Sequence, residues 1–239
     1  MYITSLNNSK VKEWNKLKIK KYRDQEKKFI IEGDHLVNIA LKNNLVESLI
    51  CIEDKYDFNN KYIVTKEIMK KLSSQVSISN EMAICNFINK NKIEGNVIIL
   101  DNIQDPGNMG TIIRSAVAFN FKTIIISNDS VDLYNEKTIR ATEGMLFNLN
   151  IIIGNLNKYI DELRKNDYLI LGTDVNKGTN ISNFKDKKIA LIIGNEGQGM
   201  HNNLKLLCDK MVNIKMNSKC ESLNAGVAAS ILMSEVYHE

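Results

Sequence analysis

The sequence predicts an α/β fold in which a mainly parallel sheet carries helices on both faces and follows a smaller α/β domain. From Val97 onward, short apolar runs alternate with amphipathic helical patterns, which is typical of a parallel sheet covered on both sides. Before this region, the polar stretch 89–96 has no apolar periodicity and is the best linker candidate. We therefore expect one domain at 1–92 and a second at 97–239.

The first domain is expected to begin with a helix from about Asn8, because Val11, Trp14, Leu17 and Tyr22 fall near one helical face. A small α/β unit should follow, with strands near 29–31, 46–52, 62–64 and 82–87 and helices near 36–41 and 67–72.

The second domain should alternate strand and helix throughout. Its expected strands cover 97–100, 123–127, 149–153, 168–173, 189–194 and 211–215. Its expected helices cover 110–119, 135–142, 158–165, 201–207 and 223–237. Ligands of such sheets bind beyond the carboxyl ends of the strands, so the loops at that edge are the candidate site.

Composition narrows the class of protein. The chain has 239 residues, of which 44% are hydrophobic and 25% charged, as in soluble globular proteins. It has no apolar run of membrane-spanning length and no signal-peptide core near its start. The four cysteines and three histidines lack metal-type or redox-type spacing. We expect a cytoplasmic protein with reduced thiols, no metal site and no membrane partner.

Positive charge is concentrated at the amino terminus. Residues 1–28 carry nine lysines and arginines against three acidic residues, while the whole chain has a net charge of +4. This pattern fits either a solvated helix face or an electrostatic footprint for nucleic acid, and charge alone does not decide between them.

The first polar loop contains the only proline of the chain. Pro106 fixes its own φ and pushes Asp105 towards extended geometry. The two glycines that follow allow positive φ or a close backbone approach. Asn108 is a candidate helix cap, and Arg114 lies about a turn and a half into the expected helix. The loop thus presents an amide and a guanidinium at a strand–helix junction.

Two further loops have similar positions after strands. In the second, Gly194, Gly197 and Gly199 surround Glu196, in a spacing that is neither the dinucleotide fingerprint nor a P-loop. In the third, Ser222 and Asn224 flank the start of a helix of small residues. Taken singly, these loops fit a plain turn, a helix cap and close helix packing.

Together the three loops resemble the three motifs of the SpoU/TrmH branch of the SPOUT RNA ribose methyltransferases. Residues 105–114 match the first motif (D-P-x-N-x-G-x-x-x-R), 194–199 the second (G-N-E-G-x-G), and 221–224 (E-S-L-N) with the following helix the third. The amino-terminal part, from 3–5 to 29–33, resembles the family's L30e-like substrate-binding domain. The resemblance covers the whole chain.

This resemblance implies transfer of a methyl group from S-adenosylmethionine (AdoMet) to a ribose 2′-hydroxyl in RNA, a carboxyl-terminal trefoil knot and a homodimer. It implies an AdoMet pocket formed by Thr173, Gly194, Gly197, Ile214, Met216 and Leu223. It assigns catalysis and RNA contacts at the site to Arg114, Asn108, Glu196, Ser222 and Asn224. The candidate cations for further RNA binding are Lys18, Lys20, Lys21, Arg23 and Arg140.

Some points stay open at this stage. Lys215 stands where the family commonly has a proline, which puts the backbone of the AdoMet pocket in question there. Arg114 either acts as the general base, as the family often assigns, or holds an RNA phosphate and lowers the pKa of the 2′-hydroxyl. Ribosomal RNA, 23S above all, is the favoured substrate, with transfer RNA, a non-catalytic RNA-binding relative and a Rossmann-type nucleotide enzyme as alternatives.

Overall fold

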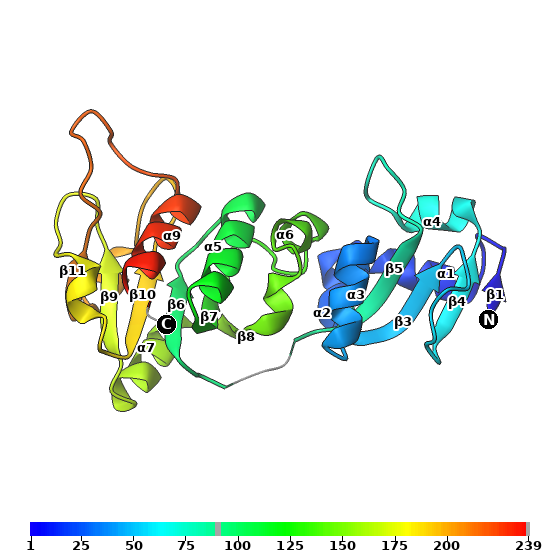
Figure 1. Ribbon diagram of the computed structural model, residues 1–239, viewed down its shortest axis with the longest axis horizontal. Helices are drawn as coiled ribbons and strands as arrows, with labels where there is room; N and C mark the ends of the chain where they lie inside the picture. The colour runs from blue at the N-terminus through cyan, green and yellow to red at the C-terminus, as the bar shows by residue number, and fades with distance from the viewer. Residues whose placement is uncertain (89–91, 238–239) are drawn as a thin grey trace. The chain divides into compact units, whose positions relative to one another are not determined.

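The computed structural model describes residues 1–88 and 92–237, which form two compact units (Figure 1). The first unit contains Met1–Ile88 together with Asp132–Phe147, and the second contains the rest of the described chain. This differs from the expected division at 1–92 and 97–239, because 132–147 belongs to the first unit. Residues 89–91 of the predicted linker and 238–239 of the predicted second domain lie outside the described residues.

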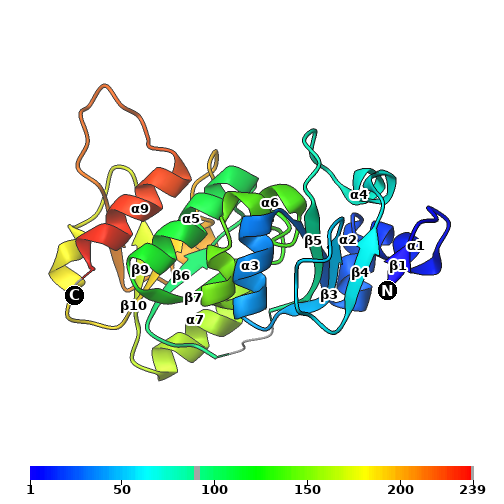
Figure 2. The ribbon, with the colours of Figure 1, turned by 45° about the vertical axis from the view of Figure 1, so that its right-hand side comes forward.

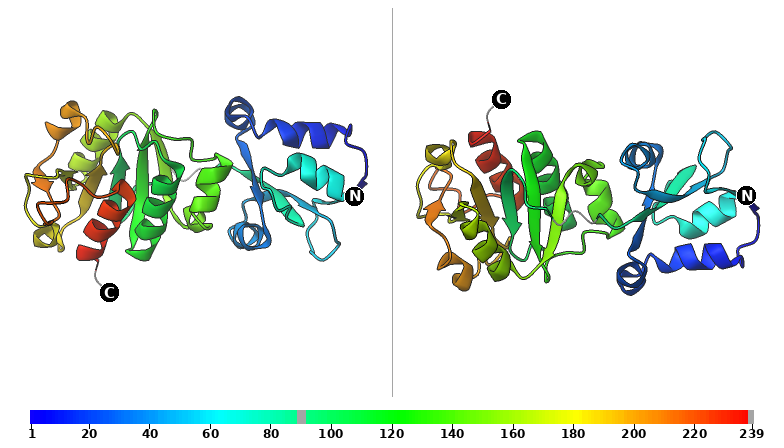
Figure 3. Two further views of the ribbon diagram at one scale, coloured as in Figure 1. Left: turned by 90° about the horizontal axis from the view of Figure 1, so that it is seen from above. Right: turned by 90° about the horizontal axis from the view of Figure 1, so that it is seen from below.

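The first unit is a five-stranded mixed sheet in the order β1-β4-β3-β5-β2. Its strands are β1 (Tyr2–Ile3), β2 (Lys28–Glu32), β3 (Val46–Cys51), β4 (Lys61–Val64) and β5 (Glu81–Asn86). Its helices are α1 (Ser9–Lys16), α2 (Lys20–Glu26), α3 (Asp34–Lys42), α4 (Lys66–Leu72) and α6 (Glu136–Ala141). Within this unit, α1 and α4 lie on one face of the sheet and α3 on the other (Figure 3).

The single helix expected from Asn8 to Tyr22 is wrong, because the chain breaks between α1 and α2. Leu17 is buried as predicted, but Ile19 is extended, with φ −101° and ψ 127°. Because the helix is broken here, the carbonyl oxygen of Leu17 accepts no helical backbone hydrogen bond within the described residues, and the Arg23 guanidinium donates to it at 2.7 Å. Arg23 is therefore buried rather than presented to solvent.

Aromatic stacking explains why 132–147 belongs to the first unit. The Tyr134 ring stacks on Phe87, with ring centroids 3.9 Å apart, and packs against Phe29 at 4.7 Å. Its hydroxyl accepts a hydrogen bond from the backbone N–H of Ile88 at 2.9 Å. Asp132 pairs with Arg23 at the start of the same segment.

The second unit is a six-stranded sheet in the order β11-β9-β10-β6-β7-β8, and every strand pair in it is parallel. Its strands are β6 (Asn96–Leu100), β7 (Phe121–Ser127), β8 (Asn150–Gly154), β9 (Leu169–Thr173), β10 (Ile189–Ile193) and β11 (Lys210–Val212). The prediction of a mainly parallel sheet is confirmed. The third polar loop starts earlier than expected, because β11 ends at Val212 rather than at 215.

Helices cover both faces of this sheet, as predicted. They are α5 (Pro106–Ala118), α7 (Leu156–Lys165), α8 (Asn202–Lys205) and α9 (Ala225–Glu235), with the short 3-10 turn η2 (Ile181–Phe184). A second 3-10 turn, η1 (Met145–Asn148), begins in the 132–147 segment of the first unit. In the second unit α5 and α9 lie side by side on one face, with α7 on the other (Figures 2 and 3). A Cβ on Gly226 would lie 3.0 Å from Thr111, so the small residues of α9 serve close packing on α5.

The burial of Arg23 leads to a stability prediction. Replacing Arg23 with Met should lower the free energy of unfolding of the first unit by about 3 kcal/mol, because the Leu17 carbonyl and the Asp132 carboxylate lose their partner. Urea unfolding followed by the fluorescence of Trp14, the only tryptophan, reports this unit. The matched control is Lys21→Met, since Lys21 is exposed. A loss below about 0.5 kcal/mol for Arg23→Met would contradict the structural role of Arg23.

Candidate functional site

The first polar loop ends in a capped helix start. Asp105 is the N-cap of α5, with φ −86° and ψ 123°, and its carboxylate accepts a hydrogen bond from the backbone N–H of Asn108 at 2.8 Å. Pro106 occupies the first helical position, where no backbone donor is needed. The expectation that Asn108 caps the helix is therefore wrong. Gly107 does not have the positive φ that its residue type allows, because it already belongs to the first turn of α5.

The second polar loop is a tight turn with its own hydrogen bonds. Asn195 and Gly199 exchange two backbone hydrogen bonds, of 3.0 and 2.9 Å. The Asn195 side chain accepts from the backbone N–H groups of Gly197 and Gln198. Gly199 has a φ of 68°, and a Cβ on Gly194 would lie 2.3 Å from the nitrogen of Met200. These glycines close the turn, and the Gly197 N–H is committed within it.

A single carboxylate joins the two loops. The carboxylate oxygens of Glu196 accept hydrogen bonds from the backbone N–H groups of Gln104 and Asp105, each at 3.2 Å. They also accept one from the side-chain amide of Asn108 at 2.9 Å. Asn108 is buried, so its amide is held inside this contact. We name this set of four residues the Glu196 clamp.

The clamp also sets the ionisation of its carboxylate. Burial by itself raises the pKa of Glu196, but the hydrogen bonds from Asn108 and from backbone N–H groups outweigh it. The pKa of Glu196 is therefore lowered from its ordinary value. The clamp is accordingly charged at neutral pH, and its contribution is lost only as the pH falls through this lowered pKa.

Next to the clamp lies a cavity of about 380 Å³ at the carboxyl ends of β9 and β10. All six predicted cofactor residues line it, namely Thr173, Gly194, Gly197, Ile214, Met216 and Leu223. Glu196 and Ser222 line it as well. Asp174 and Asn176 also line the cavity, and they were not predicted from the sequence. Their place in the loop that follows β9 could have indicated them, because ligands bind at the carboxyl ends of such strands.

The third loop supplies one wall of the cavity and a helix cap. Asn224 does not line the cavity. Its side-chain oxygen accepts from the backbone N–H groups of Gly226 and Val227, at 2.9 and 3.2 Å, so it caps α9. Ser222 is exposed at the rim, and Lys215 is also exposed. The structure thus gives Asn224 a structural role and leaves Ser222 free to face a ligand.

Arg114 projects from α5 outside the cavity lining. It is exposed, and its side chain has no hydrogen-bond or ion-pair partner within 1–88 and 92–237. The structure therefore brings Asn108 and Glu196 into contact and leaves Arg114 without a partner among the described residues.

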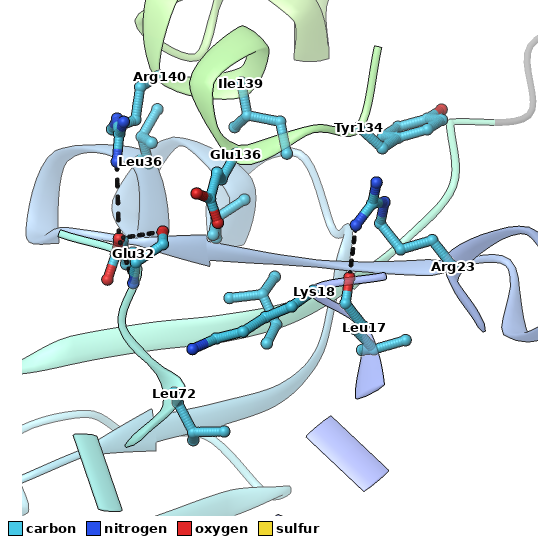
Figure 4. A pocket seen from close by; sticks show the side chains of 13 residues that line it. Leu17, Lys18, Arg23, Glu32, Leu36, Leu72, Tyr134, Glu136, Ile139 and Arg140 are labelled. Carbon is cyan, nitrogen blue, oxygen red and sulfur yellow. Dashed lines mark hydrogen bonds and ion pairs between the residues drawn. The ribbon is translucent and has the colours of Figure 1, made fainter. Parts of the chain in front are cut away.

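The predicted RNA-binding cations of the first unit differ in whether the protein itself holds them, and Figure 4 shows Arg23 and Lys18. Arg23 is only 5% exposed and is held by Leu17 and Asp132, so the expectation that it contacts RNA is wrong for this structure. Lys18 is exposed, but its ammonium donates to the backbone carbonyl groups of Lys71, in the last turn of α4, and of Ser73, just after it, at 2.8 and 2.9 Å. Lys20 and Lys21 are exposed and have no partner among the described residues.

Arg140 faces the buried carboxylate of Glu32 in a small pocket of the first unit (Figure 4). The two charged groups are 3.9 Å apart, which is an ion pair without a hydrogen bond. Glu32 takes its hydrogen bonds from Ser73 and Ser74 instead. Arg140 is therefore only loosely held.

No described helix is both long and apolar enough to cross a membrane. Across 1–88 and 92–237, no group of three or more His, Cys, Asp or Glu side chains is arranged to hold a metal ion.

Comparisons with known proteins agree with this geometry. The model of the SpoU rRNA methylase family matches residues 95–234, and that of the MRM3-like substrate binding domain matches 8–82. The chain belongs to the SpoU rRNA methylase family. This SpoU chain is 32% identical, over 99% of its length and 98% of the relative's, to the 23S rRNA (guanosine(2553)-2′-O)-methyltransferase RlmP of Bacillus subtilis.

Solved structures show the same fold. The AdoMet-bound rRNA methyltransferase from Sinorhizobium meliloti has a TM-score of 0.87 and 25% identity, covering 99% of this SpoU chain and 97% of that structure. AviRb from Streptomyces viridochromogenes has a TM-score of 0.87 at 22% identity, with 96% and 97% covered. The SpoU chain is an RNA methyltransferase, and AdoMet is its methyl donor.

The Glu196 clamp leads to a binding prediction for this SpoU enzyme. In Glu196→Gln, a carboxamide donor replaces one of the acceptor oxygens, so the three N–H donors of the clamp lose at least one acceptor. We expect AdoMet to bind about tenfold more weakly, as measured by titration calorimetry. Glu162→Gln, an exposed glutamate on α7, is the control. Unchanged affinity in Glu196→Gln would contradict the role of the clamp.

Proposed function

We propose that this protein transfers the methyl group of AdoMet to a ribose 2′-hydroxyl of 23S rRNA, at the nucleotide that RlmP modifies. The observation that carries the proposal is the cavity beside the Glu196 clamp, lined by all six residues expected to hold AdoMet. The end-to-end similarity to RlmP supports 23S rRNA over transfer RNA.

The residues of the cavity fit AdoMet. Its volume of about 380 Å³ is within the range of small-molecule sites. The bare backbone at Gly197 lets a flat base approach closely, while Ile214, Met216 and Leu223 offer apolar contact. When bound, AdoMet supplies an electrophilic methyl group on a sulfonium. The exposed Ser222 at the rim would orient the incoming ribose.

Arg114 is proposed to hold RNA rather than to act as a base. Its guanidinium is effectively always protonated, so it cannot accept the proton of the 2′-hydroxyl. Because it is exposed and unpartnered among the described residues, it can pair with the phosphate of the target nucleotide. Its charge would then lower the pKa of the nearby 2′-hydroxyl and fix its direction of attack. Asn108 is committed to Glu196 and would act by placing the start of α5.

The finer assembly also belongs to this proposal. A homodimer is supported by the exposed apolar side chains of Val227 and Tyr237, which lie on or just beyond α9. A carboxyl-terminal trefoil knot is supported by the return of α9 to pack on both α5 and η2 after β11 has paired with β9. We place the reaction in the cytoplasm, where ribosomal RNA is modified. The domain division is proposed to separate RNA capture in the first unit from methyl transfer in the second.

Arg114 provides the test of the proposed activity. Arg114→Ala should lower methyl transfer to 23S rRNA by about a thousandfold or more, while AdoMet affinity stays within about twofold, because the residue lies outside the cavity. Transfer of labelled methyl groups, followed by mapping of 2′-O-methylation in the RNA, measures the effect. The control is Lys165→Ala, an exposed cation on α7. Near-normal turnover in Arg114→Ala would refute this role.

The free lysines of α2 lead to a prediction on RNA affinity. Lys20→Gln with Lys21→Gln should reduce the slope of log affinity against log salt by about 1 to 2, because each lost phosphate contact removes about 0.7 to 0.9 from that slope. Filter binding across a salt series measures it. Lys165→Gln with Lys187→Gln removes the same charge from exposed positions of the second unit. Equal slopes for the two pairs would remove α2 from the RNA footprint.

A further inference from the structure

A histidine and a buried aspartate lie at the carboxyl ends of β6 and β10, beyond the residues assigned so far. Asp101 directly follows β6, and its side chain is 4% exposed. One of its carboxylate oxygens accepts from the backbone N–H of His201 at 2.8 Å. The other lies 2.8 Å from the Nδ1 atom of the same residue. A single imidazole and its own backbone thus occupy both oxygens of this carboxylate.

This pair fixes the far end of the glycine-rich turn that forms a wall of the donor cavity. Met200 lines the cavity, and His201 is the next residue. At the near end of the turn, the Asn195 amide donates to the carbonyl of Asn102 at 2.8 Å. The middle is held by the Glu196 clamp. The turn is therefore attached to the first loop at three points, and His201 supplies the third.

We propose that His201 is a positioning residue for methyl transfer, which holds the end of the glycine-rich turn on Asp101 and so keeps the wall of the AdoMet cavity in place. The inference rests on the proposed function, because AdoMet binding is its readout. His201 itself does not line the cavity and contacts no reacting atom. Its side chain is 46% exposed and lines a different pocket, with Ser127 and Asp129, so it acts on the AdoMet cavity through the turn alone.

The charges around His201 make this attachment sensitive to pH. The charged groups that face the imidazole are Asp101, at the end of β6, and Asp129, in the loop after β7. The hydrogen bond with Asp101 raises the pKa of His201 above its ordinary value, and the charges of Asp101 and Asp129 add to this. The ionic part of the contact is therefore complete below about pH 6.5 and is lost as the pH rises through the raised pKa.

Two substitutions separate the hydrogen bond from the charge. In His201→Asn, the side-chain amide nitrogen can take the place of Nδ1 and donate to Asp101, but it does not titrate. In His201→Leu, the donor is lost and the buried carboxylate keeps only the backbone N–H. Affinity for AdoMet is measured by calorimetry between pH 6 and 9. The amino group of AdoMet itself titrates with a pKa of about 8. This titration changes AdoMet affinity equally in the wild-type protein and in His201→Asn, so it cancels in the ratio of the two affinities.

We expect His201→Leu to bind AdoMet about tenfold more weakly across the range, with cooperative unfolding retained. Relative to His201→Asn, the wild-type protein should lose about threefold in affinity from pH 6 to 9, the effect of a half-exposed ion pair. If His201→Leu binds within twofold of wild type, or if the ratio of wild type to His201→Asn is constant with pH, the inference is overturned. A wild-type protein that does not bind AdoMet would instead overturn the proposed function, and the inference with it.

Discussion

The carboxylate of Glu196 is the contact on which the rest of the site depends. It links a loop after β10 to the start of α5, across 88 residues of sequence from Asn108. Three N–H donors of the first loop donate to this carboxylate, and hydrogen bonds to an ionised acceptor are stronger than those between neutral groups. The same donors would be left without their carboxylate acceptor if Glu196 were absent. Each loop therefore stabilises the other.

The parallel sheet makes this contact available. Strands β6 and β10 are neighbours in parallel register, so their carboxyl ends meet at one edge, and the backbone N–H of Asp101 still donates to the carbonyl of Ile193 beyond β6. From there Asp105 and Pro106 turn the chain directly into α5. The missing side chain at Gly194 lets the second loop fold back over its own strand. Local turn chemistry thus places the groups that the long-range contact then fixes.

Much of the fold and the lining of the cavity could be predicted from the sequence, because strand alternation and three local loop patterns carry that information. Contacts between side chains far apart in the sequence could not be predicted in this way. Nothing local to Arg23 indicates that its guanidinium turns inward to Leu17 and Asp132. The stacking of Tyr134 on Phe87 likewise joins segments that periodicity treats separately. Asn224 is the opposite case, because the sequence already indicated it as a possible helix cap and its side-chain oxygen does cap α9.

The most direct test of the account is amide hydrogen exchange at the first loop. In the free wild-type protein, the N–H groups of Gln104 and Asp105 should exchange at least about tenfold more slowly than in Glu196→Gln, because each donates to that carboxylate. The amides of β6 should exchange alike in both proteins. If Gln104 and Asp105 exchange equally fast with and without the carboxylate, Glu196 does not hold the loop and the central claim fails.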